Sequence, residues 1–420
     1  MSVATKQNKK KVFIRTFGCQ MNVRDSEVIC GLLRVRGYEL IAEPKQAEVI
    51  ILNTCSVRQH AEDKVWSEIG RFGKDKTQGR LAFKKYFKDV PRKADMFPII
   101  GVVGCMAQNY QEKVFERAPQ VDFVVGPSDI YKIPDIISEF LRPQGQSKKS
   151  ADGHSHKGNF FERKIWEVDA CVRPEGIYHT GYYEDAKHAY VVISEGCSNC
   201  CSYCVVPYVR GRLHNRDSRG ILREIEEAID NGLTQVTLLG QNVNSYKAQK
   251  IRDGMQIDFI GLLKQVNRIR GLEQFSFLTS HPKDTTLDLF RVMTECEKLK
   301  KYLHLPVQAG SDRILKLMKR GYTRKFYLDL INHYRKIVNN GVLTSDIIVG
   351  YPTETEEDFQ DTCALVRDAQ FNAAFIFKYS PRPHTEAARL NDTVERKEKE
   401  RRHRTILNLQ KSISLHMPLS

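Results

Sequence analysis

The chain has 420 residues, 41% of them apolar, which is enough for two or three domains with buried cores. No apolar run approaches the roughly twenty residues needed to cross a bilayer, and the basic start has no signal-peptide core, so we expect a cytoplasmic protein without membrane association. The formal net charge of +15 favours a polyanionic partner such as nucleic acid over a merely solvated basic surface.

Residues 11–143 alternate short β-rich runs with helical stretches. Strands are predicted at 12–17, 49–53, 99–103 and 121–125, and a helix at 25–37. Strands separated by helices predict an α/β fold with a doubly wound parallel sheet. The stretch 74–93 has eight Lys or Arg against two Asp and is predicted to be an insertion or a basic surface loop. Residues 144–188 are predicted to be a linker, because 143–158 are rich in Gly, Ser, Lys and His.

The alternation becomes steadier in residues 189–390. Strands are predicted at 190–194, 235–239, 274–278, 302–306, 345–349 and 373–379. Helices are predicted between them at 218–231, 259–270, 286–295, 324–340 and 355–368. Six βα units in series predict a partial (β/α)6 barrel, a fold whose active sites lie at the carboxyl ends of the strands. Residues 391–420 are predicted to form a charged helical tail.

Eleven cysteines in a chain of this kind indicate metal or redox chemistry rather than a disulfide framework. Cys197, Cys201 and Cys204 follow the first predicted barrel strand with the spacing C-x3-C-x2-C. Three such thiolates can hold three irons of a [4Fe–4S] cluster and leave the fourth iron open to chelate a small molecule. Structural zinc is the alternative, although its candidate fourth ligand, His214, stands in a different local context. Cys200 leaves the register open, because it could exchange roles with its neighbour.

Three further cysteines, Cys19, Cys55 and Cys105, each follow a predicted strand of the first domain directly. The carboxyl ends of parallel strands line one crevice, where ligands bind, so these three side chains should converge. A single cysteine in such a place is more often inert, but three in equivalent places indicate a second site. The remaining five cysteines are predicted to be non-ligands, Cys200 as an extra residue beside the triplet and the others packed in helices or lying in the interdomain connection: Cys30, Cys171, Cys296 and Cys363.

These motifs resemble the methylthiotransferase family of radical S-adenosylmethionine (SAM) enzymes. The family combines C-x3-C-x2-C, with an aromatic residue (here Tyr203) before the last cysteine, with three cysteines in an amino-terminal domain. Segments 16–22 (TFGCQMN), 53–58 (NTCSVR) and 103–107 (VGCMA) are similar to its tRNA branch, called MiaB. Segments 239–246, 304–311 and 346–350 also match. The branch that modifies a ribosomal protein usually has Cys-Pro-Lys-Asn at the first site, and the branch that modifies threonylcarbamoyl-adenosine in tRNA favours Cys-Lys-Val-Asn.

The resemblance implies a transferase that replaces the hydrogen on C2 of N6-isopentenyladenosine, at position 37 of tRNA next to the anticodon, with a methylthio group. This C–H bond is neither acidic nor readily attacked by a nucleophile, so radical chemistry from a cofactor is needed. The implied cofactors are SAM and two [4Fe–4S] clusters. Cys197, Cys201 and Cys204 would hold the cluster that reduces SAM and releases a 5′-deoxyadenosyl radical.

Cys19, Cys55 and Cys105 would hold an auxiliary cluster that donates the sulfur, and a second SAM would supply the methyl group. The implied partners are the anticodon stem-loop of tRNA and a reduced flavodoxin- or ferredoxin-type electron donor. A monomer is expected. No catalytic residue is assigned beyond the cluster ligands.

Candidate SAM contacts lie at the carboxyl ends of predicted barrel strands: Gly240, Gln241, Asn242, Gln308 and Gly350. Both glycines have an alternative role as turn residues. Arg210 and Arg212 follow the cluster loop and could meet phosphate, or could simply be exposed.

The chain departs from the usual pattern of the family at three positions that are not presumed ligands. Relatives usually carry Phe at Cys200 and Gly at His384, and often Gly at Thr353. The family usually ends in a small β RNA-binding (TRAM) domain that is not present in the sequence up to Ser420, so we expect that the domain is either truncated here or absent from the protein. Two rivals come from other classes. An iron–sulfur electron carrier should show compact C-x2-C-x2-C-x3-C-P runs, which are absent, whereas an RNA-binding protein with structural zinc stays open.

Overall fold

The computed structural model describes residues 9–56, 59–86, 98–142, 164–169, 172–252 and 255–415. They belong to two compact units, Met1–Glu184 and Asp185–Ser420. Among the described residues, no helix combines the length and apolar character that crossing a bilayer requires.

The first unit is built on a six-stranded sheet in which every neighbouring pair of strands is parallel, as predicted. Its order is β2-β1-β3-β4-β5-β6. The strands are β1 (Lys11–Thr16), β2 (Glu39–Leu40), β3 (Val49–Thr54), β4 (Ile99–Gly104), β5 (Phe123–Val125) and β6 (Ile165–Glu167). The four predicted strands are confirmed. The two that were missed, β2 and β6, have two and three residues, too few for a periodic pattern.

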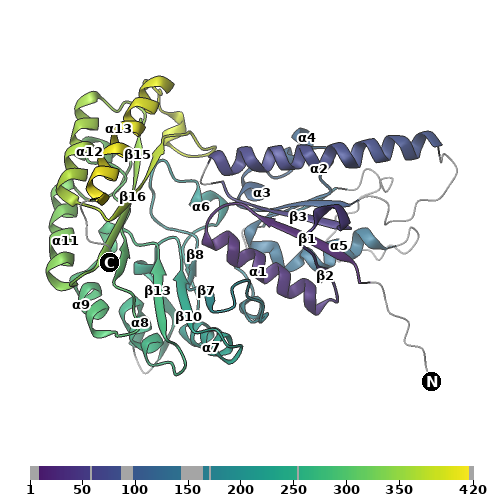
Figure 1. Cartoon of the computed structure of the whole chain (residues 1–420), viewed down its shortest axis with the longest axis horizontal. Helices are drawn as coiled ribbons and strands as arrows, with labels where there is room; N and C mark the ends of the chain where they lie inside the picture. Colours follow the sequence, from purple (N-terminus) through teal and green to yellow (C-terminus); the bar gives the residue numbers. More distant parts are fainter. Residues whose placement is uncertain are drawn as a thin grey trace. The chain divides into compact units, whose positions relative to one another are not determined.

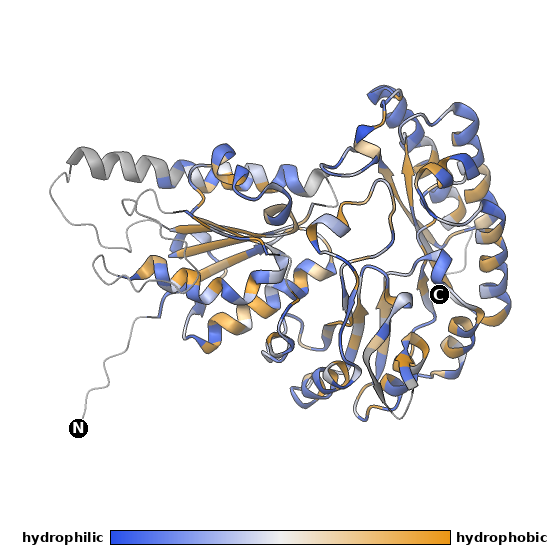
Figure 2. Ribbon diagram, turned by 180° about the vertical axis from the view of Figure 1, so that it is seen from behind, coloured by the Kyte–Doolittle hydropathy of each residue, from blue (hydrophilic) through white to orange (hydrophobic). Residues whose placement is uncertain are grey.

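Helices cover both faces of this sheet, so the doubly wound prediction is confirmed (Figure 1). The helices are α1 (Gln20–Val35), α2 (Gln59–Tyr86), α3 (Cys105–Tyr110), α4 (Lys113–Arg117) and α5 (Ile133–Leu141). In Figure 1, α1 and α5 lie on one face and α2, α3 and α4 on the other. The strands are coloured mostly hydrophobic, whereas the helices carry both hydrophobic and hydrophilic residues (Figure 2). Burial of apolar residues from both sides is the main stabilisation of such a layered sheet.

The prediction of an insertion or loop at 74–93 was wrong for residues 74–86, which continue α2. Val65, Ile69, Phe72 and Lys76 are buried at helical spacing along this helix. Lys76 pairs with Asp122 and donates to the Gln120 carbonyl 3.0 Å away. The basic composition therefore hid a helical stripe that includes a buried lysine. Residues 87–93 lie outside the described part of the chain.

The linker prediction for 144–188 also needs correction. Residues 165–167 form β6, which pairs in register with β5, and Arg173 forms a buried ion pair of 2.7 Å with Asp25 of α1. Arg24 donates to the Tyr178 carbonyl 2.8 Å away. The stretch 164–184 is thus part of the first unit, because the strand pairing with β5, the buried ion pair and the hydrogen bond to α1 attach it there. Residues 143–163 lie outside the described part of the chain.

The second unit has the six parallel strands predicted for it, in two sheets ordered β13-β10-β7 and β14-β15-β16. A parallel bridge between Phe275 and Leu299 links β13 to the residues just before β14. The strands are β7 (His188–Val192), β10 (Gln235–Leu239), β13 (Gln274–Leu278), β14 (Tyr302–His304), β15 (Val342–Val349) and β16 (Ala373–Lys378). This arrangement confirms the partial (β/α)6 barrel.

All five predicted barrel helices are present. They are α7 (Ser218–Asp230), α8 (Phe259–Asn267), α9 (Leu287–Glu295), α11 (Arg324–Ile337) and α12 (Glu356–Ala369). Side chains of Asp217, Asp258, Thr323 and Thr355 accept backbone N–H groups at their starts. Elements that were not predicted are short or lie between barrel units: β8 (Ser194–Glu195), α6 (Val206–Val209), β9 (His214–Asn215), β11 (Lys247–Arg252), β12 (Met255–Asp258) and α10 (Asp312–Leu317).

The charged tail is helical, as predicted, but it packs on the second unit. Helix α13 (Arg396–Leu415) lies against β16 and α12. Arg402 forms a buried ion pair of 2.8 Å with Glu354, and Gln410 donates to the Phe371 carbonyl. Residues 391–415 are therefore better described as part of the barrel unit than as a tail.

Candidate functional site

Cys19, Cys55 and Cys105, here called the sheet-edge cysteines, follow three adjacent strands of the first unit. Cys19 is the N-cap residue of α1 just after β1, Cys55 follows β3, and Cys105 begins α3 directly after β4. The chain leaves β1 toward β2 on one side and resumes at β3 on the other, so the topology switches between β1 and β3. Ligands in open parallel sheets bind outside the carboxyl ends of the strands at such a switch point. The structure therefore brings the three predicted ligands to the expected end of the sheet.

Two glycines permit the close approach of these loops. Gly18 has φ +138°, and a Cβ added there would lie 2.5 Å from the Cys55 Cβ. Gly104 has φ +91°, and a Cβ there would lie 2.5 Å from Asn53 Oδ1. Since neither conformation suits a residue with a side chain, both loops require glycine.

An asparagine pair that the sequence analysis did not single out ties the loops together. Asn22 Nδ2 donates to Asn53 Oδ1 (3.2 Å) and to the Thr54 carbonyl (3.1 Å). Asn53 Nδ2 donates in return to the Asn22 carbonyl (2.8 Å). The Cys19 thiol donates to Asn22 Oδ1 at 3.5 Å. The two side chains, both fully buried, thus connect the Cys19 loop to the end of β3.

Cys197, Cys201 and Cys204, here called the barrel cysteines, lie in the loop after β8. The Cys197 amide donates to the Gly211 carbonyl (3.1 Å) and the Cys204 amide to the Cys201 carbonyl (3.0 Å). Gly196 has φ +68°, and a Cβ there would lie 2.3 Å from the Arg212 carbonyl oxygen. The loop is therefore packed against 210–212 by backbone contacts that require glycine.

Each barrel cysteine accepts a hydrogen bond at sulfur. The Asn199 amide donates to Cys197 Sγ (3.4 Å), Arg320 Nη1 donates to Cys201 Sγ (3.3 Å), and the Val206 amide donates to Cys204. Burial raises the pKa of the Cys204 thiol to about 12 and also raises the pKa of Cys197. Thiols with such a raised pKa become ligands only when a metal displaces their protons.

The sulfurs of the two trios can be compared with the spacing that a zinc site requires. Sulfurs on one tetrahedral zinc, at a Zn–S distance of about 2.3 Å, lie about 3.8 Å apart. In the described part of the chain, neither trio of cysteine sulfurs lies within 4.8 Å of one another. Thiolates that bind separate irons of a cubane are spaced more widely, and soft thiolate donors suit iron–sulfur clusters. The soft thiolate donors of both trios therefore suit an iron–sulfur cluster, as the resemblance implies.

One set of three carboxylate side chains does have the spacing of a cation site. Ligand oxygens of Asp129, Glu167 and Asp169 lie within 4.8 Å of one another. The Lys132 ammonium sits among them, 3.0, 2.7 and 3.5 Å from their oxygens. A lysine therefore already supplies the positive charge there.

The predicted SAM contacts near β10 lie in a polar environment. A Cβ added at Gly240 would lie 2.5 Å from Ser194 Oγ, so this glycine keeps the ends of β7 and β10 close. Gln241 Oε1 and Asn242 Oδ1 are buried and have no hydrogen-bond partner among the described residues. Asn242 Nδ2 donates to Asp284 Oδ2 (2.7 Å).

Four more buried polar atoms without such a partner were missed by the sequence analysis. They are Ser194 Oγ, Asn215 Oδ1, Ser280 Oγ and His281 Nε2. Ser194 lies two residues after β7, Ser280 and His281 lie two and three residues after β13, and Asn215 lies in β9. Buried polar groups normally find partners, so orphaned atoms gathered at the carboxyl ends of barrel strands indicate a polar ligand. No local sequence signal marks these residues, apart from their place after predicted strands.

His281 is held in one tautomer. Its Nδ1 accepts the Lys283 amide at 3.2 Å, which assigns the proton of the neutral ring to Nε2. Burial lowers the pKa of this imidazole to about 3, and the Arg320 guanidinium acts in the same direction. His281 is therefore a neutral donor with Nε2–H available to a ligand.

The remaining predicted SAM contacts differ in kind. Gln308 has φ +76° and its backbone bonds to Asp346 and Ile348 of β15. Gly350 has φ +70°, and a Cβ there would lie 2.3 Å from the Lys399 side chain of α13. Packing against α13 is enough to explain the glycine at Gly350, so the turn-glycine alternative has the structural support.

Other predictions about cysteines and basic residues can be compared with their burial. Cys30, Cys296 and Cys363 are buried, as expected of packed residues, and Cys200 is exposed. Cys171 lies outside the described part of the chain. Arg210 is only 8% exposed, so the expectation of an exposed arginine applies to Arg212 alone.

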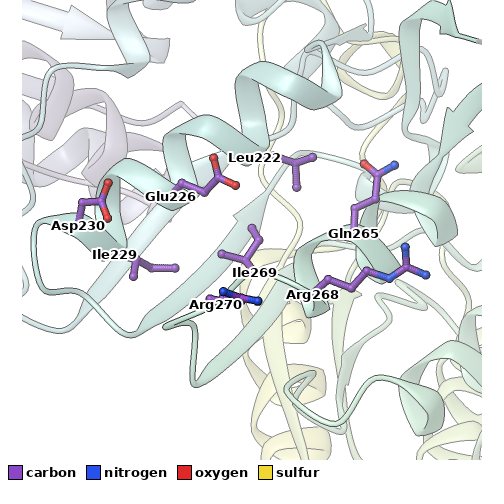
Figure 3. Close-up of a pocket in the computed structure, with 8 residues that line it drawn as sticks. All are labelled: Leu222, Glu226, Ile229, Asp230, Gln265, Arg268, Ile269 and Arg270. Carbon is purple, nitrogen blue, oxygen red and sulfur yellow. The ribbon is translucent and has the colours of Figure 1, made fainter.

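A pocket of about 370 Å³ opens elsewhere, between α7 and α8 (Figure 3). Its lining includes Ile229, Asp230, Arg268 and Arg270, at the ends of these helices. Helices of a βα unit run back along the strands, so their ends lie by the amino ends of the strands. The pocket therefore has no part in the cysteine site at the opposite end.

Comparisons with known proteins agree with this geometry. Residues 11–126 match the family described as "Uncharacterized protein family UPF0004", and residues 191–366 match the radical SAM superfamily. A solved structure of the cobalamin-dependent S-adenosylmethionine radical enzyme OxsB, with aqua-cobalamin bound, has a TM-score of 0.53 at 12% identity. The match covers 97% of this chain and 57% of that chain, and it supports the fold alone.

Relatives with a named function are more similar in sequence. A tRNA-2-methylthio-N(6)-dimethylallyladenosine synthase of Moorella thermoacetica is 41% identical over 409 residues, 97% of this chain and 84% of the relative. The enzyme of the same name from Natranaerobius thermophilus is 40% identical, over 97% of this chain and 82% of the relative. The MiaB-branch prediction is confirmed by these matches. The chain belongs to the tRNA-2-methylthio-N(6)-dimethylallyladenosine synthase family of radical SAM transferases, enzymes whose superfamily is defined by a [4Fe–4S] cluster and SAM.

Proposed function

We propose that this protein inserts a methylthio group at C2 of N6-isopentenyladenosine at position 37 of tRNA, forming 2-methylthio-N6-isopentenyladenosine. The observation that carries the proposal is about 40% identity, over 97% of the chain, to enzymes named for this product. The two cysteine trios, each at the carboxyl ends of parallel strands, supply the ligands that such chemistry needs. The net charge of +15 suits a polyanionic substrate.

The barrel cysteines are proposed to hold the cluster that binds SAM. Three thiolates leave one iron open, and each sulfur accepts a hydrogen bond from a neighbouring group. When bound, the cluster and SAM together supply a carbon-centred radical able to remove hydrogen from an unactivated C–H bond. The protein's own task is to bind SAM beside the open iron and to keep water away.

SAM is proposed to bind at the orphaned polar atoms of the second unit. Gln241 Oε1 and Asn242 Oδ1 can accept hydrogen bonds from a polar ligand, the Ser280 hydroxyl can accept or donate one, and His281 Nε2–H can donate one. Of the contacts predicted from sequence, Gly240, Gln241 and Asn242 keep their proposed role. Gln308 remains a candidate at the end of β14.

The sheet-edge cysteines are proposed to hold an auxiliary [4Fe–4S] cluster that carries the sulfur to be transferred. Cys55 and Cys105 are 1% and 3% exposed, whereas Cys19 is partly open to solvent. This combination gives a sheltered site with access from one side. The Asn22–Asn53 pair holds the Cys19 and Cys55 loops in place.

The RNA target and the electron source complete the proposal. A base must be unstacked to reach the reacting centre, which costs a few kcal/mol and least for an unpaired loop base. An anticodon loop meets this requirement. We infer a reduced flavodoxin- or ferredoxin-type protein as the electron donor, a monomeric enzyme, and a cytoplasmic location where tRNA is modified.

Turnover on synthetic anticodon stem-loops tests this function. The purified protein, reduced and supplied with SAM, is incubated with stem-loops that carry or lack the isopentenyl group, and the nucleosides are analysed by mass spectrometry. We expect a methylthio product only from the isopentenylated loop, because the similar enzymes are named for a dimethylallyladenosine product. Equal turnover of the two loops would contradict the substrate assignment but leave methylthio transfer standing. Absence of product from both would contradict the function.

A further inference from the structure

Arg320 is a buried cation in contact with the barrel cysteines. It lies between α10 and α11 and is only 4% exposed. Its Nη1 donates to Cys201 Sγ at 3.3 Å. Nη2 donates to the Pro306 carbonyl at 2.7 Å and Nε to the Tyr322 hydroxyl at 2.9 Å. These three hydrogen bonds therefore fix the orientation of the guanidinium, with one of its N–H groups directed at the Cys201 sulfur.

This arginine has no carboxylate partner in the part of the chain that the structure describes. Two other buried arginines of the same unit do: Arg216 lies 2.5 Å from Glu224, and Arg402 lies 2.8 Å from Glu354. A buried charge without a counter-charge costs several kcal/mol, so a buried arginine normally faces an anion. Besides the Pro306 carbonyl, the Arg320 guanidinium donates to the Cys201 sulfur and to two tyrosine hydroxyls, those of Tyr203 and Tyr322.

The three sulfurs also differ in the charge of their donors. Cys197 and Cys204 accept from backbone amides, whereas Cys201 accepts from a guanidinium, which stays protonated at any working pH. Among the described contacts to these sulfurs, Arg320 is the one cationic donor. Hydrogen bonds to the sulfurs and local charge are two of the factors that set the potential of an iron–sulfur cluster.

We propose that Arg320 is a positioning residue that raises the reduction potential of the cluster held by the barrel cysteines. One-electron reduction adds a negative charge and breaks no bond, and a fixed cation on Cys201 stabilises that added charge. The inference rests on the cluster ligation given under the proposed function. It explains why the protein keeps a buried arginine without a carboxylate, and it gives the guanidinium a role separate from binding SAM or RNA.

The test compares two substitutions with different consequences for charge. Arg320→Gln removes the charge and keeps an amide donor, and Arg320→Lys keeps the charge and loses the fork. Arg402→Gln is the matched control, a buried arginine of the same unit that is held by a carboxylate. Potentials are measured on the full-length protein by titration with a low-potential chemical reductant, followed by electron paramagnetic resonance. The signal that changes on addition of SAM identifies the cluster in question.

We expect the equilibrium constant for reduction to fall at least tenfold in Arg320→Gln, equivalent to a potential about 59 mV lower for one electron. In Arg320→Lys the potential should fall by less than half of that amount, because the charge is kept. In Arg402→Gln the potential should stay unchanged. Arg320→Gln with full iron and an equilibrium constant within twofold of the parent would overturn the proposal. So would loss of the cluster from both Arg320 variants, because Arg320 would then be a folding residue.

These results stay separate from the test of the proposed function. The titration needs no tRNA, so a protein that makes no methylthio product can still show or lack the shift. A parent protein that binds no iron at the barrel cysteines would contradict the proposed function itself.

Discussion

Replacing Gly18 with alanine should disable the auxiliary site while sparing the barrel site. The added Cβ would lie 2.5 Å from both the Cys55 Cβ and Asn22 Oδ1. Neither neighbour can move easily, since Asn22 is fully buried and bonded to Asn53 and Thr54, and Cys55 is 1% exposed. The substitution therefore pushes directly on a proposed iron ligand.

The size of the effect follows from two costs. Ordinary van der Waals contact begins near 3.4 Å, so the overlap is 3.4 minus 2.5, or about 0.9 Å. Overpacking of this kind costs about 1–3 kcal/mol. The positive φ of Gly18 adds about 1–2 kcal/mol for a residue with a side chain. The first unit should therefore lose about 2–5 kcal/mol of stability, and iron should fall from about eight to about four per chain.

The substitution Gly37→Ala separates the cost of the positive φ from the cost of the steric overlap. Gly37 also has a positive φ, +81°, and lies just after α1, the helix that Gly18 precedes. A Cβ at Gly37 would meet nothing within 4 Å. It should cost about 1–2 kcal/mol and leave all the iron in place. The measurements are iron per chain after anaerobic purification and urea unfolding. Retention of about eight irons by Gly18→Ala, with a stability equal to that of Gly37→Ala, would refute the reasoning.

Three further predictions concern the cysteines and His281. Substituting the barrel cysteines together with alanine should leave about four irons and abolish SAM cleavage, whereas substituting the sheet-edge cysteines should leave about four irons and keep cleavage without product; full iron in either triple variant would contradict the ligand assignment. Cys200→Phe should keep both clusters and activity, because the Cys200 side chain is exposed, and loss of iron would mean that the triplet register is one residue out. His281 stays neutral in the folded protein down to a pKa of about 3, but protonates near its ordinary pKa of 6.5 when unfolded. Its stabilising effect is therefore complete above pH 6.5 and declines as pH falls toward 3. Between pH 8 and pH 5 the parent should lose about 2 kcal/mol more than His281→Gln, measured by urea unfolding at each pH, and parallel pH profiles would contradict this.

The barrel could be predicted closely because its signals are local. Its strands are short apolar runs, and its helices begin at capping residues such as Asp217 and Thr355, which lie next to the positions they cap. β6 could not be predicted in this way. It is a three-residue segment whose stability comes from pairing with β5. The basic half of α2 was misjudged because the buried Lys76 pairs with Asp122, 46 residues further along the chain.

Two departures from the family pattern also find a physical meaning in the fold. Thr353 and His384 have φ of +68° and +69°, in the left-handed region that glycine adopts more readily than other residues. The sequence marks these positions only by comparison with the usual glycine. The positive φ at both positions shows that the usual glycine would avoid the backbone strain that a side chain brings there.

The sequence by itself predicted the fold class and indicated which cysteines are the candidate cluster ligands. The spacing C-x3-C-x2-C places three thiolates in one loop, so the covalent chain alone brings them close. The period of apolar runs then predicts strands and helices, and parallel strands predict where a site lies.

Only the tertiary structure decided which distant residues meet at those sites. Asn22 and Asn53, 31 residues apart, join the loops of the sheet-edge cysteines. Arg320 reaches Cys201 across 119 residues, and His281 acquires its tautomer and its low pKa from burial and its neighbours. These contacts depend on which strands are adjacent and on which side chains are buried together. Both are set by the packing of the whole unit, which leaves no mark on the local sequence.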